Sequence, residues 1–344
     1  MTDRRNIGSS VSPQPKQSAV KPPRKRDMEE DMFRYAMYFI LTYVIFIIAR
    51  FPTITEFLRK KNMDSGLWEF VYLIPTTLFS HGLFQFNRRV SIKFIEPHLI
   101  RRCDPEHKLS QQEYLNKCAD YLSGGVHYVL AFAITFYFAW KHGFVPRVMG
   151  GDLDLSIEYN SRVRDYPFDL RMVFMFAFGH HADRLLVHWL TKRSSPTYYS
   201  MLCHHITACG VMAMAYHMKY LMFGIPVILL FDPSDAQLHI SRLLRETNCR
   251  KTTEVVFLWM VVTWLLTRVI GYFWEIIWPM LVIIYRGDHE YFSAFPVVHY
   301  FFFFCLMLLA ILNVFWFYQI LKITVSAIIM KKDKIEYEDR QGSA

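Results

Sequence analysis

Long runs of apolar residues constrain what this chain can fold into more than any other feature. Phe33–Ile48 is nearly free of charge, and Phe301–Trp316 is almost entirely apolar or aromatic. A helix that crosses a bilayer needs about 20 mostly apolar residues, because lipid offers backbone N–H and C=O groups no partner outside the helix. A soluble domain of this length would carry more charge and show shorter apolar runs. The sequence therefore predicts an all-α, polytopic membrane protein.

Eight segments have the length and composition expected of membrane spans. They are residues 33–50, 67–86, 120–140, 169–190, 200–218, 220–240, 254–284 and 296–328. The last two are long enough to tilt or to extend beyond the membrane. The sixth contains Pro226 and Pro233, which we expect to break the helix. We therefore expect a bundle of about six to eight transmembrane helices.

The distribution of charge orients these spans. The net charge is +9, but the basic residues cluster in loops beside apolar segments, which is typical of membrane topology signals rather than of a nucleic-acid surface. Counted from the N-terminal tail, alternate loops are basic, and this pattern predicts that both termini are cytosolic. The first lumenal loop, with Arg59-Lys60-Lys61, does not follow the pattern. Residues 1–30 are polar and rich in proline and basic residues, so we expect a disordered cytosolic tail without the apolar segment of a cleaved signal peptide.

His204 and His205 are the strongest candidates for chemistry within a predicted span. Ionisable residues in lipid cost roughly 2.5–3.5 kcal/mol each on insertion scales, so they are functional candidates by default. Histidine titrates near neutral pH and can act as a base, an acid or a nucleophile. Adjacent helical positions diverge by about 100°, so one ring can face a cavity while the other orients it. The alternative is a pair of interfacial histidines that extend to the membrane surface.

Asp232 and Asp235 lie three residues apart, so on one helix they share a face. A carboxylate there could orient an imidazole and stabilise its charged form, or it could receive the cationic amine of a substrate. Asp232-Pro233-Ser234-Asp235 is also typical of a helix start, with Asp232 as the N-cap and Pro233 at the first helical position. Arg268 lies on an otherwise apolar segment and needs an anionic partner if it is buried. One of the aspartates or a substrate anion could supply it; the alternative is that Arg268 extends to the basic cytosolic side.

His180, His181, Asp183 and Arg184 form a second polar group within a predicted span. They could bind a metal, but we favour a buried polar network. None of the six cysteines forms a CxxC pair, so the chain lacks the zinc and redox motifs built on that spacing. We therefore predict no metal site.

The segment Met201–Arg245 resembles the signature region of TLC-domain proteins, in particular of the ceramide synthase branch. The matching residues are His204-His205 with Thr207, Tyr216, Gly224, Asp232-x-x-Asp235, and downstream Thr267-Arg268 with Gly271 and Trp316-Phe317-Tyr318 with Lys322. The combination of the histidine pair with the aspartate pair is specific, whereas either pair alone is not. Weaker similarity reaches back to about Lys117. We therefore expect a TLC domain over 117–330, two N-terminal transmembrane helices and a cytosolic loop over 31–116, and a charged cytosolic tail over 331–344.

The resemblance implies a helical bundle around a long cavity for an acyl chain, in the endoplasmic reticulum membrane. It implies an enzyme that joins a fatty acyl-CoA, as co-substrate, to the amine of a sphingoid base, giving (dihydro)ceramide and CoA without a further cofactor. His204, His205, Asp232 and Asp235 match the family's catalytic residues. An acyl-imidazole intermediate on one histidine is the mechanism that the resemblance implies.

Five basic residues are candidates for substrate binding. We expect Arg268 to face a substrate anion or an aspartate, and the cytosolic residues Lys192, Arg193, Arg242 and Arg245 to bind the phosphates of CoA. The partners implied are the acyl-CoA, the sphingoid base and the lipid bilayer, with no nucleic acid. A homo- or heterodimer is compatible with this interpretation.

The sequence departs from the family pattern in the basic loop Thr191–Pro196, in Pro233 between the aspartates and in the histidines at 180–181. The main alternative is a non-catalytic TLC-domain protein that acts in protein translocation, cargo export or lipid sensing. A non-enzyme has no evident use for four costly ionisable groups in lipid, which argues against it. Further alternatives are a transporter with a proton relay and a metal-dependent lipid hydroxylase or desaturase, but the chain has no HxxHH box typical of the latter.

Overall fold

The computed structural model describes residues 67–99, 111–153, 166–191, 198–246, 250–286 and 296–329, together with single positions between 38 and 56. Within these ranges every regular element is helical, apart from a single bridge between Pro146 and Leu153. This confirms the all-α prediction. The predicted span 33–50, most of the predicted first lumenal loop and the two predicted tails lie outside the described residues.

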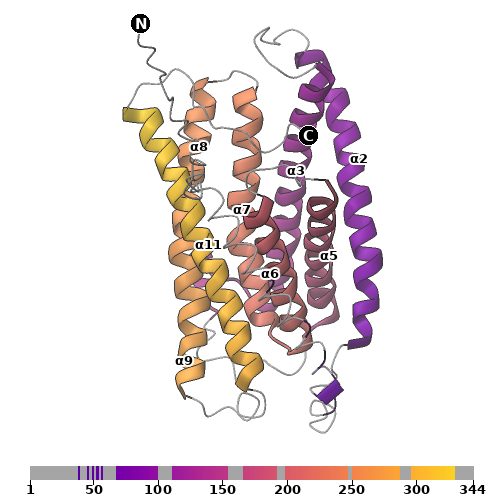
Figure 1. Ribbon diagram of the computed structural model, residues 1–344, viewed down its shortest axis with the longest axis vertical. Helices are drawn as coiled ribbons and strands as arrows, with labels where there is room; N and C mark the ends of the chain where they lie inside the picture. Colours follow the sequence, from indigo (N-terminus) through magenta and orange to yellow (C-terminus); the bar gives the residue numbers. More distant parts are fainter. Residues whose placement is uncertain are drawn as a thin grey trace, which may run out of the picture.

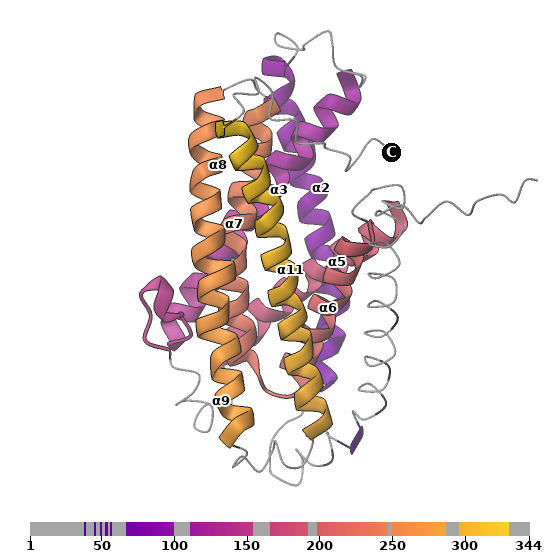
Figure 2. The same cartoon turned by 60° about the vertical axis from the view of Figure 1, so that its left-hand side comes forward.

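Long helices run side by side along the molecule, and successive helices alternate in direction (Figures 1 and 2). In chain order they are α2 (Leu73–Leu99) with the preceding 3-10 turn η1 (Leu67–Tyr72), α3 (Gln111–His142), α5 (Phe168–Thr191), α6 (Tyr198–His217), α7 (Leu221–Glu246), α8 (Arg250–Trp264) and α11 (Pro296–Ile329). The helix α8 continues through two π-helical stretches, η3 (Leu265–Gly271) and η4 (Phe273–Ile277), into α9 (Trp278–Arg286). A short 3-10 turn, η2 (Arg147–Met149), follows α3.

Four of these helical segments are long and apolar enough to cross a membrane. They are Gln111–His142, Leu221–Glu246, Lys251–Arg286 and Pro296–Ser326. The predicted spans 67–86, 169–190 and 200–218 fall on η1–α2, α5 and α6, which are helical but less apolar or shorter. The chain is thus a multi-pass membrane protein, and the number of six to eight spans stays a prediction.

Glycine residues allow neighbouring helices to approach closely. α3 lies along α7 at Gly124, where an added methyl group would collide with the ring of His239. α2 lies along α5 at Gly179, where a methyl group would collide with the backbone of Thr76. Membrane helices associate through close packing and hydrogen bonds, because lipid removes the hydrophobic driving force between them. These two contacts therefore fix the pairs that carry the polar side chains described below.

The helix α7 passes through Pro226 and Pro233 without a break. The predicted break is therefore wrong, and so is the interpretation of Asp232 as an N-cap. A proline in a membrane helix is tolerated where neighbouring groups satisfy the freed backbone. The Arg268 guanidinium of the neighbouring helix η3 donates to the carbonyl oxygen of Phe231, two residues before Pro233, at 2.9 Å. The carbonyl that Pro233 itself leaves without its usual donor is that of Leu229.

At the lower end of the bundle in Figure 1, a buried carboxylate connects η1 to α5 and α6. Glu69 on η1 is fully buried and accepts hydrogen bonds from Arg171 of α5 and from the hydroxyl of Tyr216 of α6. Breaking a buried ion pair by removing one partner is costly, because the other charge stays desolvated. This cluster therefore anchors η1, and with it α2, to the rest of the bundle.

The variant Glu69→Ala should lower the free energy of unfolding by roughly 3 kcal/mol, since it leaves Arg171 and the Tyr216 hydroxyl without their acceptor. Thermal unfolding of the purified protein in detergent measures the change. Asp152→Ala is the control, because Asp152 is an exposed carboxylate and its removal should change stability by less than about 0.5 kcal/mol. Equal stability of the two variants would contradict an anchoring role for Glu69.

Candidate active site

A chamber of about 230 Å³ lies inside the bundle, between α3, α5, α6, α7, η3 and α11. All four predicted catalytic residues line it. Its polar and charged lining consists of Tyr128, His181, His204, His205, Asp232, Asp235, His239, Arg242, Arg268 and Gln319. Along α7 the lining extends from Phe223 to Arg242, a rise of about 28 Å. The chamber is therefore elongated along the bundle, with its ionisable groups near the middle and its apolar end toward the lower end in Figure 1.

The histidine pair reaches the chamber from α6. The rings of His204 and His205 lie 5.4 Å apart between centroids, at 59° to each other. The His204 ring packs edge-on against Trp316 of α11, and the His205 ring lies 5.6 Å from His188 of α5. The Nδ1 atoms of both are buried and have no hydrogen-bond partner among the described residues. The pair therefore faces the interior, and the interpretation as surface-seeking interfacial histidines is wrong.

Arg268 extends from η3 into the chamber lining and forms an ion pair with Asp235 of α7. Its guanidinium also donates to the Ser234 hydroxyl at 2.6 Å, and it lies 4.5 Å and 4.3 Å from the ring centroids of Phe231 and Trp264. A π-helical segment displaces side chains from the normal helical register and occurs frequently at functional sites. The hypothesis that an aspartate is the anionic partner of Arg268 is confirmed, and the interpretation that Arg268 extends to the membrane surface is wrong.

The two aspartates therefore differ in their surroundings. Asp235 is neutralised by Arg268, whereas Asp232 is buried with no hydrogen bond or ion pair from any described residue. No hydrogen bond within the described ranges joins His204 or His205 to either carboxylate. A direct contact between an imidazole and an aspartate is thus not formed here, and space remains between them inside the chamber. An unpaired carboxylate in such a space is suited to a cationic group of a ligand.

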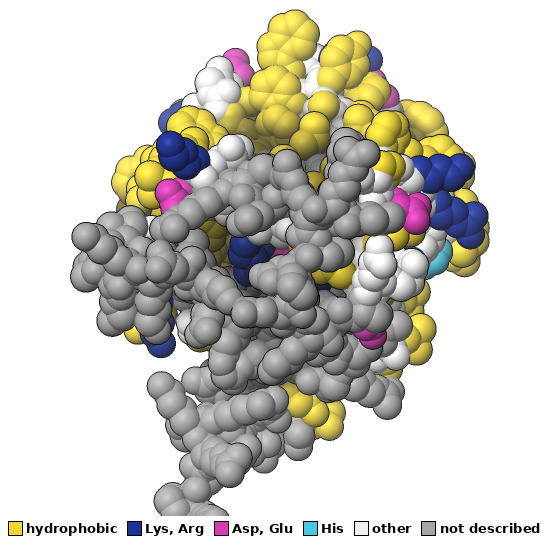
Figure 3. Space-filling model, turned by 90° about the horizontal axis from the view of Figure 1, so that it is seen from above, with side chains coloured by type: hydrophobic (Ala, Val, Ile, Leu, Met, Phe, Trp, Pro, Cys, Tyr) yellow, Lys and Arg dark blue, Asp and Glu magenta, His cyan; other side chains and the backbone are white. Residues whose placement is uncertain are grey.

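At the upper end of the bundle α2 and α7 end and α8 begins. Figure 3 looks onto this end and shows Lys and Arg side chains on it, with Asp and Glu side chains among them. Arg242 lines the chamber about 15 Å above Asp232 along α7. Arg245 does not reach the chamber and binds Glu246 at 2.8 Å. Lys192 and Arg193 lie outside the described residues.

Comparison with known proteins decides the family. The profile of the TLC domain matches residues 121–322, which is more than half of the chain. The chain belongs to the TLC-domain family. Ceramide synthase LOH1 of Arabidopsis thaliana is 24% identical over 320 residues, which cover 92% of this chain and 94% of the relative.

Two further relatives agree with that similarity. Ceramide synthase 1 LOH3 of Arabidopsis thaliana is 23% identical over 231 residues, covering 66% of this chain and 71% of the relative. Ceramide synthase 4 of Mus musculus is 28% identical over 123 residues, covering 36% and 30%. These similarities confirm the resemblance to the ceramide synthase branch of the TLC-domain family.

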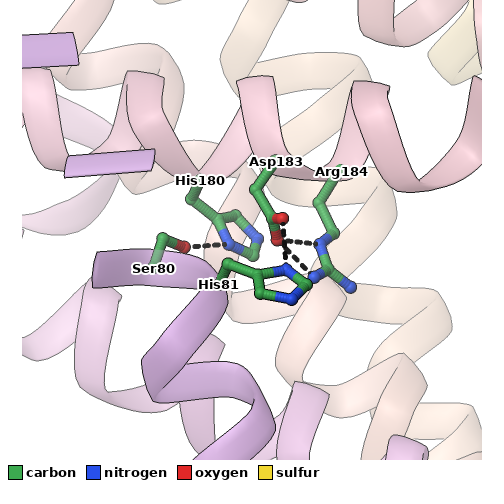
Figure 4. A network of polar contacts seen from close by, with 5 residues as sticks. All are labelled: Ser80, His81, His180, Asp183 and Arg184. Atoms are coloured by element: carbon green, nitrogen blue, oxygen red, sulfur yellow. Dashed lines mark hydrogen bonds and ion pairs between the residues drawn. The ribbon is translucent and has the colours of Figure 1, made fainter. Parts of the chain in front are cut away.

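A second polar cluster joins α2 to α5 (Figure 4). The Ser80 hydroxyl and His180 Nδ1 share a hydrogen bond of 3.1 Å, and Asp183 binds His81 Nδ1 at 2.8 Å and the Arg184 guanidinium. The polar network that we favoured for His180, Asp183 and Arg184 is confirmed. His181 is the exception, because it lines the chamber instead. Sequence analysis missed His181, Tyr128 and His239 as chamber residues; only their occurrence within a span marked them.

The charge pair between Arg268 and Asp235 can be tested by a double-mutant cycle. Arg268→Gln leaves the Asp235 carboxylate without its counter-ion and should lower the free energy of unfolding by about 3 kcal/mol. The double variant Arg268→Gln/Asp235→Asn should recover part of that loss, because both charges are then absent. Thermal unfolding in detergent of the two single variants and the double variant gives the coupling free energy. Strictly additive effects would contradict the pairing.

Proposed function

We propose that this protein is a ceramide synthase-like N-acyltransferase, which transfers a fatty acyl group from CoA to the amine of a sphingoid base. The observation that carries the proposal is the convergence of His204, His205, Asp232 and Asp235 on one elongated chamber within the membrane helices. The similarity to proteins named ceramide synthases supports the choice of reaction. The endoplasmic reticulum membrane, with both termini in the cytosol, is the location that goes with this activity.

One histidine of the pair acts on the thioester. The Nε2 atom of His204 or His205 attacks the acyl carbon, the C–S bond breaks, and the CoA thiolate takes the ring proton to leave as a thiol. The amine then attacks the acyl-imidazole, and the C–N bond to the ring breaks. The alternative within this proposal is that the imidazole removes a proton from the amine, which attacks the thioester directly. Both routes need a neutral imidazole in the chamber.

The aspartates divide two tasks. Asp235 is held by Arg268 and so keeps the guanidinium in place beside the reaction space. Asp232 has no partner among the described residues and binds the ammonium group of the sphingoid base through a charge-assisted hydrogen bond. The amine then lies in the same chamber as His204 and His205.

The two ends of the chamber suit the two ends of the acyl-CoA. Val211, Met212, Phe223, Phe302 and Leu306 line the apolar end below Asp232, where they bury the acyl chain. These walls exclude water, which favours attack by the amine over hydrolysis. Arg242 lines the opposite end, on the side that we assign to the cytosol, and binds CoA phosphates together with Lys192, Arg193 and Arg245.

The variants His204→Ala and His205→Ala test the proposal. At least one of them should lower the rate of amide formation by about 10²- to 10⁴-fold, because the nucleophile or base is lost. The assay incubates microsomes containing each variant with acyl-CoAs of several chain lengths and a sphingoid base, and quantifies the ceramide product. His142→Ala is the control, since His142 bonds Asp169 at the end of α3 away from the chamber.

Wild-type protein that forms no amide with any of these substrates would overturn the proposed activity. The non-catalytic TLC-domain alternative would then hold. Full activity in both histidine variants would instead be consistent with the proposed activity but would refute the histidine mechanism.

The two aspartates should respond differently to loss of charge. Asp232→Asn should raise the KM for the sphingoid base by about 30-fold, which corresponds to roughly 2 kcal/mol for a buried charge pair, with little change in the KM for acyl-CoA. Asp235→Asn should mainly lower thermal stability, because it leaves Arg268 buried without its counter-ion. Steady-state kinetics with each substrate varied in turn, together with thermal unfolding, measure both. An unchanged KM for the base in Asp232→Asn would contradict the assignment.

A further inference from the structure

His181 is a third imidazole of the chamber, and it comes from a different helix than the histidine pair. It lines the chamber from α5, and its Nδ1 atom is buried without a hydrogen-bond partner among the described residues. An ionisable side chain in the membrane interior is costly, and such a residue is therefore a functional candidate by default.

The orientation of His181 is fixed by its neighbours on α5. His180, Asp183 and Arg184 are held on the face toward α2 and α3: His180 by Ser80 and by a ring stacked at 3.8 Å on His127, and Asp183 by His81 (Figure 4). These contacts define the rotation of α5 about its own axis.

A neighbouring face of α5 carries His181 to the chamber. Leu185 packs against the cluster of Leu202, Cys203 and Ile206 on α6, and the ring of His188 lies 5.6 Å from that of His205. Residues 181, 185 and 188 share one helical face, so the face that carries His181 is the face that meets α6.

We infer that His181 is the base that takes the proton from the substrate ammonium held by Asp232. A primary amine has an ordinary pKa of about 10, so the sphingoid base enters as an ammonium ion that cannot attack a carbonyl carbon. An acylated imidazole of the pair cannot accept that proton at its acylated nitrogen. The inference rests on the proposed N-acyltransferase activity and assigns a residue outside the four signature positions to its second step.

The base step converts the ammonium ion and the acyl donor into the amide. His181 takes one N–H proton from the ammonium ion, and the free amine nitrogen forms a bond to the acyl carbon. The bond from that carbon to its leaving group, imidazole or CoA sulfur, breaks. The leaving group takes the second N–H proton, and His181 later releases its proton to water. The net reaction gives the amide, CoA thiol and one proton.

Other titratable groups share the chamber with His181. They are Tyr128 of α3, His204 and His205 of α6, Asp232 and Asp235 of α7, and Arg268 of η3; His239 and Arg242 lie farther up α7. Arg268 and Asp235 neutralise each other. The test must therefore separate the role of His181 from that of His204 and His205. A pH profile does this, because only the base step depends on the protonation of the amine.

The test measures amide formation by wild type, His181→Asn and His142→Asn over a range of pH in the full-length protein. At pH 7 His181→Asn should be slower by about 10²-fold. Its rate should then rise about tenfold per pH unit as free amine becomes available, so that the gap to wild type closes at alkaline pH. His142→Asn should follow the wild-type profile. His181→Gln is the second variant, with the same expectation, and thermal unfolding verifies that each variant is folded.

Each outcome is decisive. A folded His181 variant with the wild-type rate, or with a loss that is the same at every pH, would overturn the role of His181 as base while leaving the proposed activity intact. Wild-type protein without amide-forming activity would overturn the proposed activity and this role with it.

Discussion

The ion pair between Arg268 and Asp235 is the interaction on which the rest of the site depends. A guanidinium with 3% side-chain exposure in a membrane bundle is tolerated only because every side of it is occupied. Asp235 balances its charge, Ser234 and the Phe231 carbonyl accept its N–H groups, and the Phe231 and Trp264 rings cover its faces. Arginine suits this position because its planar group can bond in its plane and stack above and below it. The pair fixes α7 against η3 and leaves Asp232 as the unpaired carboxylate of the chamber.

The second charge pair, Asp183 with Arg184, follows the same rule on α5. Each is internally neutral, so neither imposes a net charge on the membrane interior. The Arg184 guanidinium lies 4.2 Å from the Phe84 ring centroid, which again replaces water with an aromatic face. The two pairs differ in where they lie: Arg268 and Asp235 border the chamber beside Asp232, whereas Asp183 also bonds His81 of α2 and so helps to set the rotation of α5. Besides Arg268 and Asp235, the chamber is lined by the Asp232 carboxylate, by Arg242 and by imidazoles that include those of His181, His204 and His205. Imidazoles are suited to moving protons near neutral pH.

Much of the site followed from the sequence because charge in lipid is expensive. His204, His205, Asp232, Asp235 and Arg268 stood out for that reason and because they matched a known pattern, and the structure brings all five to one chamber. The sequence could not show which aspartate pairs with Arg268, because both lie on the same face of one helix. It could not show the direction of His181 either. That direction depends on how α5 is rotated, which is set by contacts with Ser80 and His81 about a hundred residues earlier.

Pro233 does not end α7, contrary to the prediction from the sequence. Proline removes the N–H that would bond to the Leu229 carbonyl, and from sequence this suggested a helix end. In the structure α7 continues, and the irregularity in its hydrogen bonding lies opposite another irregular stretch, the π-helical η3. Arg268 projects from η3 and donates to a carbonyl of α7 two residues before the proline. The two irregular stretches therefore lie beside each other, and Arg268 joins them through the Phe231 carbonyl. Both aspartates face the cavity from one continuous helix, whereas a helix beginning at Asp232 would leave its first N–H groups without partners in lipid.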